Sequence, residues 1–197
     1  MDLTRILEFF KYQNGLKAVL RNNGMPDGRR ESSAEHSWSV AMMAWLLTDR
    51  IQAEKGVTLD QNKMLKMALV HDIVEIQAGD VAAWKSGDRQ AVAPDERAAI
   101  EHIAATYFGG NQSEIYALWM EHEERQTLES KVVKACDQLC PLVYRVVFGA
   151  SYHGTGVTRE KLDDIFRDVV SFSSVTSELY ELLAAEIAAK GLFDNQQ

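Results

Sequence analysis

Cysteine and proline are scarce in this chain: its 197 residues include two of the former and three of the latter. Cys136 and Cys140 are four residues apart, and one helix holds a disulfide poorly at that spacing, so we expect free thiols in a reducing compartment. The shortage of proline and of turn-forming clusters favours helices. No apolar run reaches the length of a membrane span, and the first residues lack a cleavable signal pattern. We therefore expect a cytoplasmic protein that does not bind membranes.

Basic residues are in the minority as well. Lys and Arg number 21 against 29 Asp and Glu, which gives a formal net charge of -8. This charge repels phosphate polymers at long range and argues against a nucleic-acid-binding module. A small phosphorylated ligand is still compatible with it, because a few local Arg or Lys side chains are enough to hold one. The composition, 46% hydrophobic and 25% charged, is typical of a globular chain, and the length fits one domain over residues 1–197.

The apolar periodicity predicts an all-α fold, a helical bundle, and no segment alternates as a strand would. The expected helices lie at residues 4–20, with a break near Asn14-Gly15, and at 33–55, 61–77, 94–108, 113–125, 128–148, 158–172 and 174–190. Ser32 and Glu35 form a capping box before the second of these, and Thr127 is a cap for the helix that follows it. Residues 22–31 and 84–96 are expected to be loops, with Pro94 opening the next helix.

A histidine and an aspartate stand side by side in the most apolar of these helices, in the stretch MALVHDIVEIQAGDV. A carboxylate in a buried helix must be paired, hydrogen-bonded or bound to a metal, and aspartate is a poor residue for a helix interior. His71 and Glu75 share one helical stripe, and Asp72 lies beside it. A lone histidine here would be read as a core residue with a backbone partner. Three polar groups in one quadrant favour a functional site instead.

Two further polar residues are expected to point inward from other helices. His36 continues an apolar stripe of the helix at 33–55, and Asp137 lies on a mostly aliphatic helix, where Lys134 is an alternative ion-pair partner for it. His36, His71, Asp72 and Asp137 together offer two imidazoles and two carboxylates. Such a set suits one divalent cation, such as Mn, Co, Fe, Mg or Zn. Four protein ligands leave two octahedral positions for water and a phosphate oxygen.

Two acidic residues follow the doublet and suggest chemistry beyond metal binding. Glu75 lies one turn away, close enough to orient or deprotonate a water molecule. Asp80 follows the Gly79 turn, where it can contact a sugar hydroxyl or protonate a leaving oxygen, although a turn-capping role is the alternative. His122, in the acidic stretch MEHEER, is expected on a solvated helix face.

The motifs resemble those of a known family. His36 in AEHSW, the doublet in ALVHDIVE and Asp137 in KACDQ are similar to the H…HD…D signature of the HD-domain metal-dependent phosphohydrolases. The continuation HDIVEIQAGDV looks like the 5′-deoxynucleotidase branch, and the resemblance covers about residues 10–185. It implies an all-α HD-domain bundle, often a homodimer, that removes the 5′-phosphate from deoxyribonucleoside monophosphates.

The resemblance also implies a role for each matching position. The implied metal ligands are His36, His71, Asp72 and Asp137. Glu75 would act on the water, Asp80 would assist near the sugar and the leaving oxygen, and Arg21 would bind the phosphate as a charge-assisted clamp. After Arg21 this chain has Asn22-Asn23-Gly24, where the bacterial deoxynucleotidases tend to have an aromatic residue near the sugar. The preference between deoxyribose and ribose is therefore open.

Other functions are compatible with the same metal core. It could act on a nucleoside triphosphate, a cyclic nucleotide or a phosphate ester that is not a nucleotide. The chain could also be a regulatory helical module that keeps a metal for stability alone. Glu75 and Asp80 argue against that last alternative, because a structural metal site has no need of them.

Overall fold

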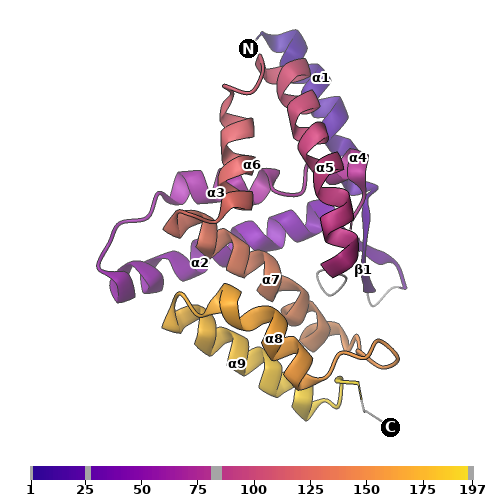
Figure 1. The fold of residues 1–197 in the computed structure, drawn as a ribbon, viewed down its shortest axis with the longest axis vertical. Coiled ribbons are helices and arrows are strands. Elements are labelled where there is room, and N and C mark those ends of the chain that lie inside the picture. Colours follow the sequence, from indigo (N-terminus) through magenta and orange to yellow (C-terminus); the bar gives the residue numbers. More distant parts are fainter. Residues whose placement is uncertain (1, 25–27, 81–85, 195–197) are drawn as a thin grey trace.

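The computed structural model describes residues 2–24, 28–80 and 86–194. It confirms the predicted all-α class, since helices make up nearly all of its regular structure (Figure 1). Helices α2 (Ser33–Lys55), α3 (Gln61–Val70) and α7 (Leu128–Phe148) cross the middle of the molecule, and α6 (Glu114–Glu124) extends from them toward the end that carries the N-terminus. At one end lie α1 (Leu3–Gln13), the short helix η1 (Asn14–Lys17), α4 (Glu75–Ala78), α5 (Ser86–Ile103) and the π-helix η2 (Ala104–Phe108). The other end is formed by α8 (Arg159–Val170) and α9 (Ser174–Ala189).

Helix α7 passes through the centre and belongs to two parts of the core. Its residues Val132, Val133 and Cys136 pack in one apolar cluster with side chains of α2 and α3. Leu139 and Leu142, further along the helix, pack in a second cluster with side chains of α8 and α9, which lie side by side in Figure 1. All five are fully buried, so α7 provides a rigid element on which a site can be built. Within the described ranges, no helix is both long and apolar enough to cross a lipid bilayer.

The predicted helix caps are present. The Ser32 hydroxyl accepts a hydrogen bond from the Glu35 backbone N–H at 3.3 Å, and the Glu35 carboxylate accepts one from the Ser32 N–H at 2.9 Å. The Thr127 hydroxyl accepts one from the Ser130 N–H at 3.1 Å and so starts α7. These caps matter for function because α2 and α7 each carry one of the predicted metal ligands.

The helix expected at residues 61–77 is not continuous. It ends at Val70, and residues 71–74 form tight turns before α4 resumes at Glu75. Within the turns the hydrogen bonds span only three residues, from the Ile73 N–H to the Val70 carbonyl at 3.1 Å and from the Glu75 N–H to the Asp72 carbonyl at 2.9 Å. Aspartate competes poorly in a helix interior, so the chain tightens at the doublet and directs both side chains inward.

Two loop predictions were also wrong. Part of residues 22–31 forms a small antiparallel hairpin in which β1 (Leu20–Gly24) pairs with β2 (Arg30–Ser32). Helix α5 begins at Ser86 and runs through Pro94, which was expected to open it. Proline removes one hydrogen bond from a helix, but the turns after it are secured by buried apolar residues such as Ile100 and Ile103. Residues 25–27 and 84–85 lie outside the described residues.

Candidate active site

The predicted metal ligands come together from three separate segments. His36 lies in the first turn of α2, His71 and Asp72 lie in the turns after α3, and Asp137 lies in the middle of α7. His36 Nε2 is 2.9 Å from Asp137 Oδ1, and His71 Nε2 is 3.8 Å from the same oxygen. Asp72 Oδ1 is 3.1 Å from His71 Nε2, and Asp72 Oδ2 is 4.0 Å from His36 Nε2. All four residues are buried.

Three of these residues form a possible metal site by geometry alone. One donor atom each of His36, His71 and Asp137 lies within 4.8 Å of the others. His71 Nδ1 is 2.8 Å from the Ala68 carbonyl, so this nitrogen carries the proton and Nε2 keeps its lone pair. That Nε2 atom is buried, has no hydrogen-bond partner and faces the oxygens of Asp72 and Asp137. A lone pair that faces carboxylates is repelled by them unless a cation lies between, so these residues fit a divalent ion.

The protonation states of His71 and Asp137 also favour a metal site. Burial lowers the pKa of His71 to about 4, because the charged imidazolium is poorly solvated there. Burial opposes the ionisation of Asp137, but Lys134 and the hydrogen bond with His36 outweigh it and hold its pKa well below the ordinary value. A neutral imidazole beside an ionised carboxylate is the state in which both groups bind metals.

Lys134 forms an ion pair with the second carboxylate oxygen of Asp137. Its Nζ donates to Asp137 Oδ2 at 2.6 Å, and the lysine is itself only 2% exposed. The predicted alternative of an ion pair within α7 is therefore present, but it uses one carboxylate oxygen and leaves Oδ1 facing the histidines. This arrangement neutralises part of the buried negative charge and fixes the direction of the other oxygen.

The side chain of Arg21, on β1 of the hairpin, extends into the same site as the predicted metal ligands. It is 14% exposed and lies among three carboxylates of the site. The distances from Arg21 Nη1 are 3.0 Å to Asp72 Oδ2, 3.5 Å to Asp80 Oδ1 and 3.8 Å to Glu75 Oε1. Burial disfavours the guanidinium charge, but these carboxylates raise the pKa of Arg21 above its ordinary value. The cation thus stays charged inside the site, as an anion-binding group must.

Glu75 and Asp80 flank this arginine. The Ser33 hydroxyl donates to Glu75 Oε2 at 2.5 Å and orients the carboxyl group. Burial and the nearby charge of Asp72 raise the pKa of Glu75 to about 9, and burial also raises the pKa of Asp80. A carboxyl group with a raised pKa holds a proton strongly, which suits a group that takes up or delivers protons in a reaction.

A small cavity of about 40 Å³ lies between these groups. Its walls include the predicted residues Arg21, His71, Asp72, Glu75, Asp80 and Asp137, and also Trp119, His122, Glu123, Lys134 and Gln138. The structure therefore brings six of the seven predicted site residues to one cavity, and the seventh, His36, contacts one of them, with His36 Nε2 2.9 Å from Asp137 Oδ1.

The prediction for His122 was wrong. This residue was expected on a solvated face, but it is 2% exposed and its ring centroid is 5.2 Å from that of His71. The signal was present in the spacing, because Ile115, Leu118, Trp119 and His122 form the buried stripe of α6. The acidic neighbours of His122 concealed this stripe.

The helical fold and this cluster of histidines and aspartates define an HD-domain protein. Residues 14–171 match the family model described as HD domain, and the chain therefore belongs to that family. This finding confirms the resemblance drawn from the H…HD…D motifs, and the family implies a divalent metal.

Individual relatives and a solved structure are similar to this chain over most of its length. The chain is 31% identical to the 5′-deoxynucleotidase HDDC2 of Xenopus laevis over 144 residues, which are 72% of this chain and 68% of the relative. It is 34% identical to the 5′-deoxynucleotidase HDDC2 of Dictyostelium discoideum over 139 residues, 69% of this chain and 73% of the relative. Among solved structures, a predicted metal-dependent phosphohydrolase from Magnetospirillum magnetotacticum MS-1 matches with a TM-score of 0.80 and 30% identity over 98% of both chains.

Proposed function

We propose that this protein is a metal-dependent phosphomonoesterase that releases the 5′-phosphate of deoxyribonucleoside monophosphates. One observation carries the proposal: donor atoms of His36, His71 and Asp137 lie within 4.8 Å of one another, Asp72 lies 3.1 Å from His71 Nε2, and a charged arginine with two further carboxyl groups borders this cluster. The named activity of the two HDDC2 relatives supports the choice of substrate.

Each residue has a physical role in this reaction. An ion held by His36, His71, Asp72 and Asp137 would supply Lewis-acid activation of water and of a phosphate oxygen. The guanidinium of Arg21 binds the phosphate by charge-assisted hydrogen bonds and offsets its negative charge. The positive charge of a bound ion would favour the ionised form of Glu75, and in that form Glu75, oriented by Ser33, takes the proton of the attacking water. Asp80 delivers a proton to the departing 5′ oxygen, so the nucleoside leaves as a neutral alcohol.

A panel of nucleotides and metals tests this function. Metal-free protein is expected to be inactive, and Mn, Co, Fe, Mg or Zn should restore release of orthophosphate and nucleoside from deoxyribonucleoside monophosphates, because the ion activates the nucleophile. Phosphate is measured colorimetrically and the nucleoside by chromatography, with the matching ribonucleotides as a second series.

The products separate the proposal from its alternatives. Triphosphate as product would indicate a nucleoside triphosphate hydrolase, and a ring-opened monophosphate would indicate a cyclic nucleotide hydrolase. If the metal-loaded protein released phosphate from no nucleotide and no small phosphate ester, the proposed function would be wrong.

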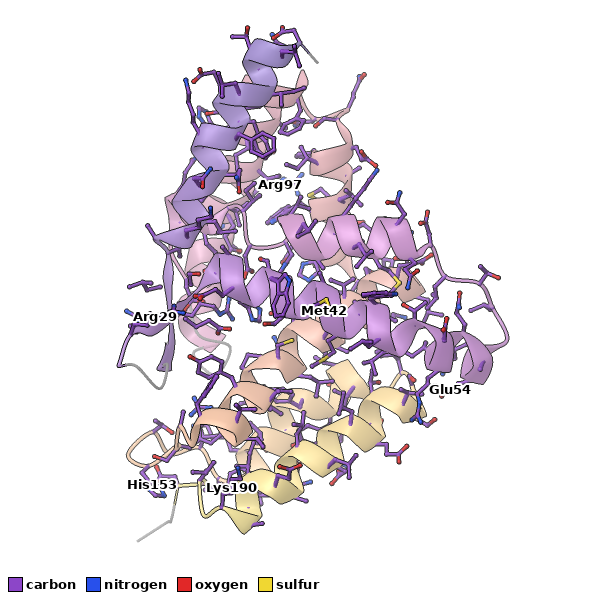
Figure 2. The ribbon with its side chains drawn as sticks, turned by 180° about the vertical axis from the view of Figure 1, so that it is seen from behind. Arg29, Met42, Glu54, Arg97, His153 and Lys190 are labelled. Atoms are coloured by element: carbon purple, nitrogen blue, oxygen red, sulfur yellow. The ribbon has the colours of Figure 1, made fainter. Side chains whose placement is uncertain are left out.

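We also propose that the protein is a homodimer in the cytoplasm. Free, buried thiols at Cys136 and Cys140 are compatible with a reducing compartment. An apolar face on α2 and α7 supports self-association. Its large exposed members are Trp38, Trp45, Leu46, Val147 and Phe148. Met42, on the face of α2 seen in Figure 2, lines one groove with Trp38, Val147 and Phe148. Groups of exposed large apolar residues on this scale mark interaction surfaces.

Replacing Trp38 by glutamate tests the dimer. Trp38 is 64% exposed, so the substitution leaves the core intact but places a charge where a partner would bury the indole. We expect wild-type protein to have twice the monomer mass in light scattering after size-exclusion chromatography, and Trp38→Glu to have the monomer mass. Leu3→Glu, at the exposed start of α1, is the matched control. A monomeric wild-type protein would contradict the proposal.

A further inference from the structure

His122 has the same two features that mark His71 as a metal ligand. In each ring, Nδ1 lies next to an oxygen acceptor: the Ala68 carbonyl at 2.8 Å for His71, and Glu123 Oε1 at 3.1 Å for His122. In each ring, Nε2 is buried and has no hydrogen-bond partner. The two side chains line the same cavity.

The contact with Glu123 determines which nitrogen of His122 is free. A carboxylate accepts hydrogen bonds and cannot donate them, so Nδ1 of the neutral ring carries the proton and Nε2 keeps its lone pair. An imidazole held by a carboxylate in this way is the usual arrangement of metal-binding histidines, because the partner fixes the tautomer and the ring orientation. A ring that served only for packing would leave a buried nitrogen unsatisfied at a cost in stability.

The spacing of the rings is also suitable. The His71 and His122 centroids are 5.2 Å apart, close to the 5.6 Å between His36 and His71. Metal–nitrogen distances of about 2.1 Å place two imidazoles on one ion with centroids roughly 4.5 to 6.5 Å apart. His122 thus lies as close to His71 as His36 does. The donor atoms within 4.8 Å of one another are those of His36, His71 and Asp137, so the His122 ring must turn toward them to bind the same ion.

We infer that His122 is an additional nitrogen ligand of the metal centre, outside the four-residue H…HD…D set. The inference rests on the proposed metal site. A third imidazole shifts the preference of the centre toward nitrogen-binding ions such as Co, Fe and Zn, and away from Mg, which favours oxygen ligands.

Metal binding by His122→Phe and His122→Gln tests the inference without any assay of turnover. Affinity for Co²⁺ and Mg²⁺ is measured by competition titration, and the number of bound imidazoles by pulsed electron paramagnetic resonance of the Mn²⁺-loaded protein. We expect three imidazoles in the wild type and two in both variants, with Co²⁺ affinity reduced by about 10- to 100-fold and Mg²⁺ affinity nearly unchanged. His102→Gln is the control, because His102 is an exposed histidine on α5.

The outcomes separate the inference from the proposed function. Two imidazoles in the wild type, or unchanged Co²⁺ affinity in both folded variants, would overturn the role of His122 and leave the four-ligand centre in place. A wild-type protein that bound none of these ions would overturn both. Circular dichroism establishes that each variant is folded, and the glutamine variant covers the case in which phenylalanine does not fit beside Trp119.

Discussion

Replacing Asp72 by alanine is expected to abolish both metal binding and phosphate release. Asp72 lies in the turn between α3 and α4, with one oxygen 3.1 Å from His71 Nε2 and the other 3.0 Å from Arg21 Nη1. The substitution removes a proposed metal ligand and, at the same time, an ion-pair partner of Arg21, the arginine proposed to bind the phosphate. We expect turnover to fall by at least about a thousandfold, because the residual rate must come without the activated nucleophile.

Metal content by elemental analysis and initial rates of phosphate release measure these two effects. Asp49→Ala is the matched control, since Asp49 lies on the exposed face of α2. Glu75 Oε1 and Asp80 Oδ1 remain 3.8 Å and 3.5 Å from Arg21 Nη1 and still offer this buried cation ion-pair partners. We therefore expect the Asp72→Ala protein to fold. An Asp72→Ala protein that kept its metal and its turnover would remove Asp72 from the ligand set.

Replacing Arg21 by alanine has the second-largest expected effect, and its pattern is different. The variant is expected to keep its metal, because Arg21 is not a ligand, and removing the cation leaves the nearby carboxylates less neutralised. Phosphate binding in the ground state and charge stabilisation in the transition state are both lost. We expect kcat/KM to fall by about 100- to 1,000-fold, the cost typical of removing one preorganised charge-stabilising donor.

The Arg21→Lys variant separates the effect of the positive charge from the effect of the guanidinium geometry. Arg21→Lys keeps the charge but not the planar fork that binds two phosphate oxygens, so we expect its kcat/KM to lie between those of the wild type and Arg21→Ala. Weaker inhibition by inorganic phosphate in both variants would locate the loss at the phosphate. Arg97→Ala on α5 is the control (Figure 2), because Arg97 pairs with Glu101 at the surface. Normal kcat/KM in Arg21→Ala would contradict the proposed role.

Much of the helical fold and the position of the candidate site could be predicted, because short stretches of sequence indicate both. Caps at Ser32 and Thr127 fix where α2 and α7 begin, and they thereby fix the faces on which His36 and Asp137 lie. The placement of a histidine and an aspartate in an apolar helix signals a site, since their burial has to be compensated. These arguments require only the chain within one or two turns of each residue.

The errors arose where distant contacts decide the structure. Asn and Gly residues near Gly24 indicate a turn, but only pairing across the turn reveals the hairpin that carries Arg21. Pro94 looks like a helix start, yet packing of the later turns maintains a helix on both sides of it. The acidic neighbours of His122 indicate solvent, while the packing of α6 against α3 and α7 buries the ring. Local composition does not contain this information.

The hairpin position of Arg21 has a consequence for how such an enzyme diversifies. The proposed metal ligands lie on α2, α7 and the turns after α3, whereas the arginine proposed to bind the phosphate extends from β1. Substitutions in the short strands at positions other than Arg21 can therefore occur without removing a proposed metal ligand. The proposed metal ligands and the proposed phosphate-binding group are therefore encoded in separate segments, whose sequences can change independently.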